Sequence, residues 1–132
     1  MTKIGIIGAG AWGTALAQAL ANSGRDILMW AREAEVVESI NKHHENKMYL
    51  PGIRLNEMIK ATHNQDEMSA CDIYLISTPA QHIRTTLDNM KFQLTGKPYI
   101  ICAKGIEKES GLLMSEVSSE VIPDGKIGFL CG

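Results

Sequence analysis

Three glycines near the amino terminus have the spacing of a dinucleotide-binding turn. Gly8, Gly10 and Gly13 follow an apolar run at residues 4–7 and precede a small, apolar series at residues 15–20. In this strand–turn–helix context the first glycine permits a sharp turn, the second lets a pyrophosphate approach the backbone, and the third lets helix and strand pack closely. The N–H groups and the positive dipole end of the helix then face the phosphates. The motif predicts a dinucleotide site; a glycine-rich turn without a ligand is the alternative.

The residues after the next expected strand, at residues 26–30, bear on the choice of cofactor. Arg32 lies about twenty residues beyond the glycines, where an acid binds the ribose hydroxyls of NAD and an arginine pairs with the 2′-phosphate of NADP. Arg32 therefore favours NADP, while NAD stays open because Glu33 follows and could reach a ribose hydroxyl. Alternatively, Arg32 is a solvated surface charge and Glu33 a first-turn acid of the next helix.

Lys104 follows a buried apolar strand expected at residues 99–103. Ligands of open α/β sheets bind outside the carboxyl ends of the strands, so a lysine there can reach an anionic phosphate. An ordinary surface lysine is the alternative. Tyr49 lies in an apolar and aromatic cluster at residues 48–52, which a Pro-Gly turn closes. It is either an anchor of its loop or a contact for a nucleotide.

The histidines do not have the spacing of a metal site. His43 and His44 are adjacent, so they cannot share one helical face as an i, i+4 pair of ligands would. The polar stretch at residues 41–47 is interpreted as a solvated loop, and no metal is expected. His82 and Arg84, in a later amphipathic helix, are interpreted as exposed charges.

Length and composition indicate one globular domain. The chain has 132 residues, a net charge of −2, 45% hydrophobic and 21% charged residues. This charge gives no argument for binding nucleic acid or an anionic membrane, and no apolar run approaches the ~20 residues of a membrane span. Cys71, Cys102 and Cys131 lie in or beside apolar runs without a C-x-x-C pair, as buried reduced thiols do. We expect a cytoplasmic protein without membrane insertion.

Strands and helices alternate along the whole chain. Pro79 is expected to open a helix with the apolar stripe Ile83, Leu87, Met90 and Leu94, and Asn64 to cap a short helix. The other expected strands lie at residues 59–62, 72–77 and 127–130, and the other helices at residues 12–22, 33–42, 64–70 and 112–121. This order predicts a doubly wound α/β domain with a mostly parallel sheet, a Rossmann-type dinucleotide-binding domain over residues 1–132.

Six short landmarks occur in a fixed order: GAGAWGTALA at residues 8–17, WAR at 30–32, YLPG at 49–52, TPAQ at 78–81, AKGIE at 103–107 and GLLMSE at 111–116. Together they resemble the amino-terminal domain of the bacterial NAD(P)-dependent glycerol-3-phosphate dehydrogenases. The resemblance covers almost the whole chain. It implies that the whole enzyme moves hydride between NAD(P)H and dihydroxyacetone phosphate, a small phosphorylated substrate. The product, sn-glycerol 3-phosphate, would serve glycerophospholipid synthesis, and the whole enzyme could be a homodimer.

The resemblance also implies roles by position. The cofactor pyrophosphate would lie against Gly8, Gly10, Ala11, Trp12 and Gly13. Arg32 would hold the adenosine phosphate or ribose, with Tyr49 near the cofactor. Lys104 would stand between the nicotinamide end and the substrate and help to hold the glycerol phosphate, and Gly132 would open the next substrate-contacting loop. Family members commonly have serine where this chain has Ala11, which removes one expected phosphate hydrogen bond.

The resemblance places the catalytic base outside this chain. In the family, the lysine that acts as general base belongs to a later, mostly helical domain, and no residue here matches its motif. A base must lie within hydrogen-bond reach of the proton that it removes. We therefore expect the base beyond Gly132 and negligible turnover by the 132 residues alone. The alternatives are a related dehydrogenase of a hydroxyacyl or sugar-acid substrate and a non-catalytic nucleotide-sensing domain.

Overall fold

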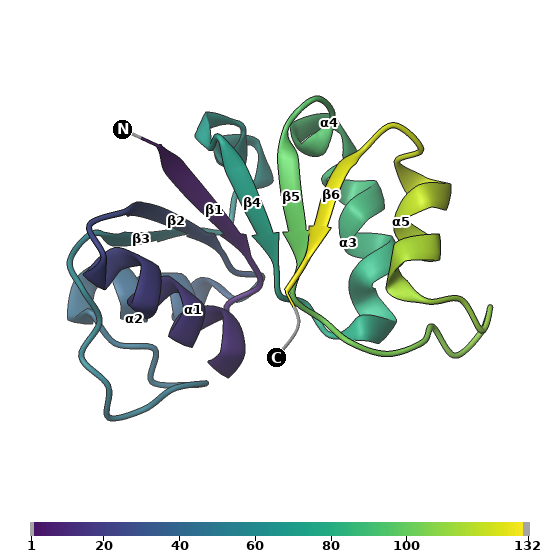
Figure 1. Ribbon diagram of the computed structural model, residues 1–132. Coiled ribbons are helices and arrows are strands. Elements are labelled where there is room, and N and C mark those ends of the chain that lie inside the picture. Colours follow the sequence, from purple (N-terminus) through teal and green to yellow (C-terminus); the bar gives the residue numbers. More distant parts are fainter. Residues whose placement is uncertain (1, 131–132) are drawn as a thin grey trace.

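Six parallel strands form one sheet in the order β3-β2-β1-β4-β5-β6 (Figure 1). The computed structural model of the protein describes residues 2–130. The strands are β1 Lys3–Ile7, β2 Asp26–Trp30, β3 Ile59–Thr62, β4 Ile73–Ile76, β5 Pro98–Ile101 and β6 Lys126–Phe129. This is the strand order of a doubly wound dinucleotide-binding domain. The predicted fold class is confirmed.

Helices connect the strands on both faces of the sheet. The helices are α1 Ala11–Asn22, α2 Ala34–His43, α3 Ile83–Asn89, α4 Lys91–Leu94 and α5 Met114–Val121, with 3₁₀ turns η1 Gln65–Ala70 and η2 Ala80–His82. The expected cap is confirmed, since the Asn64 side chain accepts a hydrogen bond from the Asp66 N–H, although the element that it caps is a 3₁₀ turn. Within residues 2–130, every helix is too short or too polar to cross a bilayer.

Two apolar cores lie on opposite faces of the sheet. Helices α1 and α2 cover the face that contains Ile6 and Met29. Helices α3 and α5 cover the face that contains Ile7, Tyr74 and Tyr99 (Figure 1). The chain first adds β2 and β3 on one side of β1, and then β4, β5 and β6 on the other side. Because βαβ crossovers are right-handed, the helices of these two halves lie on opposite faces of the sheet. The two directions meet between β1 and β4, and in folds of this kind that is the point where a ligand binds.

The segment after Pro79 differs from the single helix that the apolar stripe predicts. It consists of η2, α3 and α4, and the break between the two α-helices falls at Met90, whose φ is −102° and ψ is 8°. Asp88 and Asn89, which have low helix propensity, precede the break. The four residues of the stripe are nevertheless all buried, so the periodicity identified the buried face but not the break.

The cysteines that the structure describes are buried thiols. Cys71 and Cys102 are both free and buried, as the sequence predicted. Burial raises the pKa of Cys71 to about 11 and also raises the pKa of Cys102. Both thiols therefore stay protonated near neutral pH. Cys131 lies outside the described residues.

Candidate cofactor-binding site

The carboxyl ends of β1 and β4 lie side by side at the centre of the sheet, where Ile7 pairs with Ile76. The glycine loop, residues 8–10, follows β1, and Ser77 follows β4. In open α/β sheets this point, where the strand order reverses, is where a crevice for a ligand forms. The candidate site is therefore built around the glycine loop and extends along the same edge of the sheet.

Close contacts within the protein require glycine at two positions of this motif. Gly8 has a φ of +108°, which residues with a side chain rarely adopt. A Cβ on Gly13 would lie 2.3 Å from the Gly8 carbonyl oxygen and 2.4 Å from Ser77 Oγ. The Ser77 hydroxyl in turn reaches the carbonyl oxygens of Ile7 at 3.1 Å and Gly8 at 2.9 Å. Helix α1 is thus packed tightly against the end of β1.

Gly10 has a different environment, because the packing of the protein does not require glycine there. Its φ is −74°, and a Cβ at this position would meet no atom within 4 Å in the described part of the chain. Gly10 is the N-cap of α1, and no described side chain caps this helix. Ala11 and Trp12 are exposed beside it. An anion therefore has an open approach to the N-terminus of α1, where N–H groups and the helix dipole attract negative charge.

Asn46 anchors the glycine loop, a role that was not predicted from the sequence. Asn46 is fully buried, and its Nδ2 donates to the Ala9 carbonyl oxygen at 2.8 Å and to Thr14 Oγ1 at 2.9 Å. Its Oδ1 accepts the Tyr49 N–H at 3.1 Å. The interpretation of residues 41–47 as a solvated loop is therefore wrong at Asn46, and also at residues 41–43, which belong to α2. Local sequence carries no sign of this role, because the partners on the glycine loop and α1 lie 37 and 32 residues away.

Arg32, Glu33 and Tyr49 lie together beyond the end of β2. The Arg32 side chain is 82% exposed, and its Nε lies 3.8 Å from Glu33 Oε1. The Tyr49 hydroxyl donates to Glu33 Oε2 at 2.5 Å. This hydrogen bond is the main cause that raises the pKa of Tyr49. The loop after α2 thus brings Tyr49 next to the two residues that the sequence connected with the choice of cofactor.

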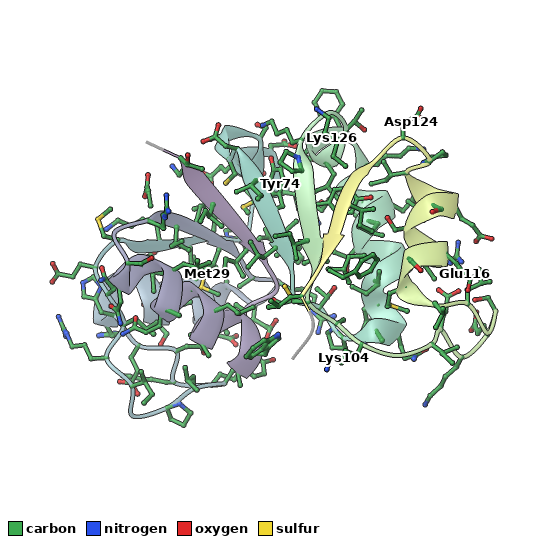
Figure 2. The ribbon with its side chains drawn as sticks, in the orientation of Figure 1. Met29, Tyr74, Lys104, Glu116, Asp124 and Lys126 are labelled. Carbon is green, nitrogen blue, oxygen red and sulfur yellow. The ribbon has the colours of Figure 1, made fainter. Side chains whose placement is uncertain are left out.

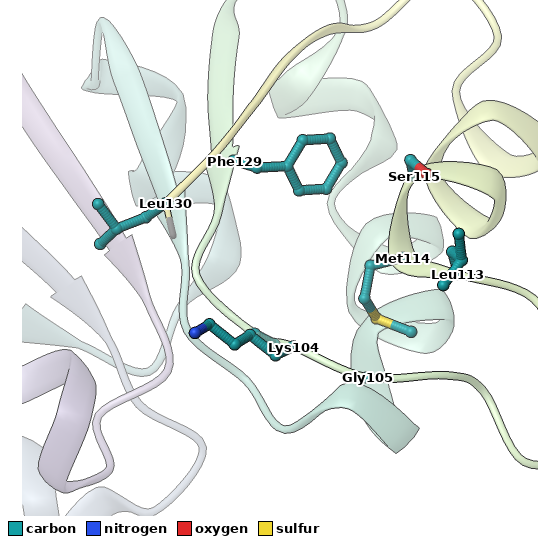
Figure 3. A pocket seen from close by; sticks show the side chains of 8 residues that line it. Lys104, Gly105, Leu113, Met114, Ser115, Phe129 and Leu130 are labelled. Atoms are coloured by element: carbon teal, nitrogen blue, oxygen red, sulfur yellow. The ribbon is translucent and has the colours of Figure 1, made fainter. Parts of the chain in front are cut away.

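Lys104 lies on the other side of the glycine loop, after β5, where it lines a pocket of about 330 Å³ (Figure 3). Phe129 at the end of β6, Leu130 after it and Met114 at the start of α5 also line this pocket. Figure 2 shows Lys104 at the edge of the sheet opposite to Lys126, which begins β6. The pocket is therefore at the carboxyl edge. Its described lining residues are mostly apolar, and Lys104 is the one cation among them.

An ion pair holds the loop that follows Lys104. Arg84 Nε lies 2.9 Å from Glu107 Oε2, and Arg84 Nη2 reaches Glu107 Oε1 at 3.0 Å and Glu120 Oε1 at 2.7 Å. Hydrogen bonds from Arg84 and then from Ser110 hold the pKa of Glu107 below its ordinary value. The prediction that Arg84 is simply an exposed charge is wrong, because this loop folds back over the start of α3. His82 is exposed, as predicted.

The structure arranges the predicted site residues along one edge of the sheet. The glycine loop lies at the centre, Arg32 follows the neighbouring strand β2, and Lys104 follows β5 on the far side of β4. Gly132, predicted to contact substrate, lies outside the described residues. Among residues 2–130, no group of three or more His, Cys, Asp or Glu side chains has an arrangement that could hold a metal ion.

Two curated relatives have the same printed name, glycerol-3-phosphate dehydrogenase [NAD(P)+]. The protein from Parvibaculum lavamentivorans is 46% identical over 131 residues, which is 98% of this chain and 39% of the relative. The protein from Erythrobacter litoralis is 47% identical over 130 residues, again 98% of this chain and 39% of the relative. The chain thus spans about two fifths of the length of the relatives that it matches.

Solved structures of the same kind of enzyme have this fold. Glycerol-3-phosphate dehydrogenase from Coxiella burnetii matches with a TM-score of 0.85 at 28% identity, over 97% of this chain and 39% of that chain. The enzyme from Plasmodium falciparum matches with a TM-score of 0.87 at 26% identity, over 99% and 40%. A UDP-glucose dehydrogenase from Pyrobaculum islandicum, at 12% identity and a TM-score of 0.72 over 98% and 35%, shares the fold alone.

A family model agrees with these similarities and covers almost the whole chain. The model described as NAD-dependent glycerol-3-phosphate dehydrogenase N-terminus matches residues 3–132. The resemblance drawn from the six sequence landmarks is therefore confirmed. The chain belongs to the NAD-dependent glycerol-3-phosphate dehydrogenase N-terminus family.

Proposed function

We propose that this chain is the cofactor-binding domain of an NAD(P)-dependent glycerol-3-phosphate dehydrogenase. The observation that carries the proposal is the glycine loop at the β1–β4 switch point. No atom of residues 2–130 lies close enough to Gly10 to require glycine there. The names of the curated relatives support the same class of reaction and cofactor. The fold by itself is compatible with many functions, and the residues of the site distinguish among them.

The pyrophosphate of the cofactor would lie against the start of α1. Gly8 and Gly13 shape the turn, and Gly10 leaves room for the phosphates next to the backbone. Ala11 and Trp12 would contribute the N–H groups of the first helical turn. Because Ala11 has no hydroxyl, recognition at this position would rely on the backbone.

We infer a preference for NADP over NAD from Arg32. Its guanidinium is largely exposed at the end of β2, the position from which a side chain reaches the adenosine ribose. A 2′-phosphate would gain charge-assisted hydrogen bonds there. NADH lacks that phosphate and would gain less from the same side chain. Tyr49, beside Arg32, would lie near the adenosine end of the cofactor.

The substrate end would lie toward Lys104. The nicotinamide, when bound, supplies or accepts the hydride of the reaction. The Lys104 ammonium would attract the phosphate of dihydroxyacetone phosphate or of the product, sn-glycerol 3-phosphate, which is then available for glycerophospholipid synthesis. The walls next to Lys104 are mostly apolar, so the ammonium would be the group of this pocket that attracts the phosphate. Gly132 would continue the same site.

The general base for the substrate hydroxyl would come from residues outside this chain. The relatives are about two and a half times as long as this chain, which covers 39% of each. We expect the 132 residues alone to reduce dihydroxyacetone phosphate at a negligible rate, since positioning and acid–base help each contribute orders of magnitude. Sustained steady-state turnover by the purified chain would contradict this. The whole enzyme is proposed to work as a homodimer.

Cofactor titrations test the proposal. We expect both NADPH and NADH to change the fluorescence of Trp12, which is exposed beside Gly10, and NADPH to bind more tightly. Arg32→Ala should weaken NADPH binding by about tenfold, equivalent to one charge-assisted contact, and leave NADH binding nearly unchanged. Arg25→Ala is the matched control, because Arg25 precedes β2 at the opposite edge of the sheet. A preference for NADH that persists in Arg32→Ala would defeat the NADP assignment.

A further inference from the structure

The end of β2 presents two residues of opposite charge to the adenosine side of the site. Arg32 is 82% exposed, whereas the Glu33 side chain is 27% exposed. A carboxylate at the end of this strand ordinarily accepts the ribose hydroxyls of NAD and disfavours a 2′-phosphate. Glu33 would therefore oppose the effect of Arg32 if its oxygens were available to the ribose.

Both oxygens of Glu33 already have neighbours in the protein. Oε2 accepts a hydrogen bond from the Tyr49 hydroxyl at 2.5 Å, and Oε1 lies 3.8 Å from Arg32 Nε. The Tyr49 hydroxyl donates its single proton in this bond, so it holds the carboxylate in a defined orientation. The same bond raises the pKa of Tyr49, and the phenol therefore remains protonated and able to donate throughout the neutral range.

Tyr49 is held in place by contacts that lead back to the glycine loop. Its N–H donates to Asn46 Oδ1 at 3.1 Å, and the Leu50 N–H donates to the Asn46 carbonyl oxygen at 2.8 Å. Asn46 is fully buried and donates to the Ala9 carbonyl oxygen at 2.8 Å. The backbone of Tyr49 is therefore fixed relative to the glycine loop, and its hydroxyl reaches Glu33 from there.

We propose that Tyr49 is a positioning residue that sets cofactor selectivity by occupying the Glu33 carboxylate. With Oε2 engaged by the Tyr49 hydroxyl, Glu33 binds the ribose hydroxyls of NADH less well, and Arg32 dominates the response to a 2′-phosphate. This inference rests on the proposed function, because it assumes that the chain binds NADPH and NADH at the glycine loop. It assigns to Tyr49 a role in discrimination between the two cofactors.

The test is the ratio of the dissociation constants for NADPH and NADH in Tyr49→Phe. This substitution removes the hydroxyl and keeps the ring, so Glu33 becomes available to the ribose. We expect the ratio to move about five- to tenfold toward NADH, which corresponds to the net contribution of one hydrogen bond. In a Glu33→Gln background the same substitution should move the ratio less than twofold. A ring with a purely structural role would change both affinities together and leave the ratio unmoved.

Tyr99→Phe is the matched control, because the Tyr99 hydroxyl is bonded to Ser118 within the core of the other face. It should alter thermal stability without altering the ratio. An unchanged ratio in Tyr49→Phe, a shift toward NADPH, or an equal shift in the Glu33→Gln background would overturn this inference alone. Failure of the unmodified chain to bind either cofactor would overturn the proposed function as well.

Discussion

The glycine loop after β1 and the Lys104 loop after β5 lie along one edge of the sheet but are held by different forces. The glycine loop is held by packing and buried hydrogen bonds: Gly13 has no room for a methyl group, and Asn46 is fully buried against Ala9. The Lys104 loop is held by side chains of α3 and η2, chiefly the Arg84–Glu107 ion pair, beside an open pocket.

This difference indicates how each part of the site should respond to change. Steric contacts and buried hydrogen bonds depend on fractions of an ångström and are insensitive to pH. The Arg84–Glu107 ion pair is partly buried, so salt weakens it only in part, but protonation of its acid weakens it directly. The cofactor side of the edge should therefore be sensitive to the size of a side chain, and the substrate side to solution conditions. Four predictions test this contrast.

Gly13→Ala should have the largest effect. The added methyl group would lie 2.3 Å from the Gly8 carbonyl oxygen, so either α1 or the glycine loop must move. Overpacking of this kind costs about 3 kcal/mol of unfolding free energy, and the displaced loop should lose most of its affinity for NADPH. Urea denaturation and an NADPH titration measure the two losses. Near-normal values for both would show that the glycine loop is not held by packing.

Asn46→Ala should have the second-largest effect, a loss of about 2 kcal/mol in unfolding free energy. It leaves the Ala9 carbonyl oxygen without its donor from Asn46 and the Tyr49 N–H without its acceptor. Lys47→Ala, which changes an exposed side chain next to it, should stay within about 0.5 kcal/mol. Equal denaturation midpoints for the two variants would refute the role given to Asn46.

Gly10→Ala separates binding from stability. Because a methyl group here meets no described protein atom within 4 Å, the unfolding free energy should change by only about 0.5 kcal/mol. The methyl group would instead stand where a pyrophosphate approaches, and NADPH affinity should fall about tenfold, or ~1.4 kcal/mol. Calorimetric titration provides the measurement. Unchanged affinity would mean that the phosphates lie elsewhere.

The smallest effect is expected from Glu107→Gln, and it should depend on pH. Arg84 holds the pKa of Glu107 in the folded chain below its ordinary value of 4.5. At a pH between the pKa of the folded chain and 4.5, Glu107 therefore binds more protons in the unfolded chain than in the folded one. Stability therefore falls as pH drops below about 4.5, and the loss grows until the folded pKa is passed. Glu107→Gln should be less stable at neutral pH and show a shallower acid-side decline. Glu109→Gln, at an exposed position two residues away, should retain the parent profile.

Much of the fold and the centre of the site follow from local sequence. The glycine spacing, the apolar run before it and the small residues after it all act within one turn and its flanks, so β1, the loop and α1 could be predicted together. The apolar runs predicted every strand to within two residues at each end. Arg32 and Lys104 were identified as site candidates because each lies within three residues of the carboxyl end of such a strand.

The contacts that only tertiary structure decides join residues far apart in the chain. Asn46 and Ala9 are 37 residues apart, Arg84 and Glu107 are 23 apart, and Tyr49 and Glu33 are 16 apart. Each pair meets because of the strand order and the path of the loops, on which local propensity and periodicity have no bearing. The sequence by itself determined where the strands end and which chemical groups follow them. The folded chain decided how those groups are paired, since pairing depends on distances that exist only after the sheet has formed.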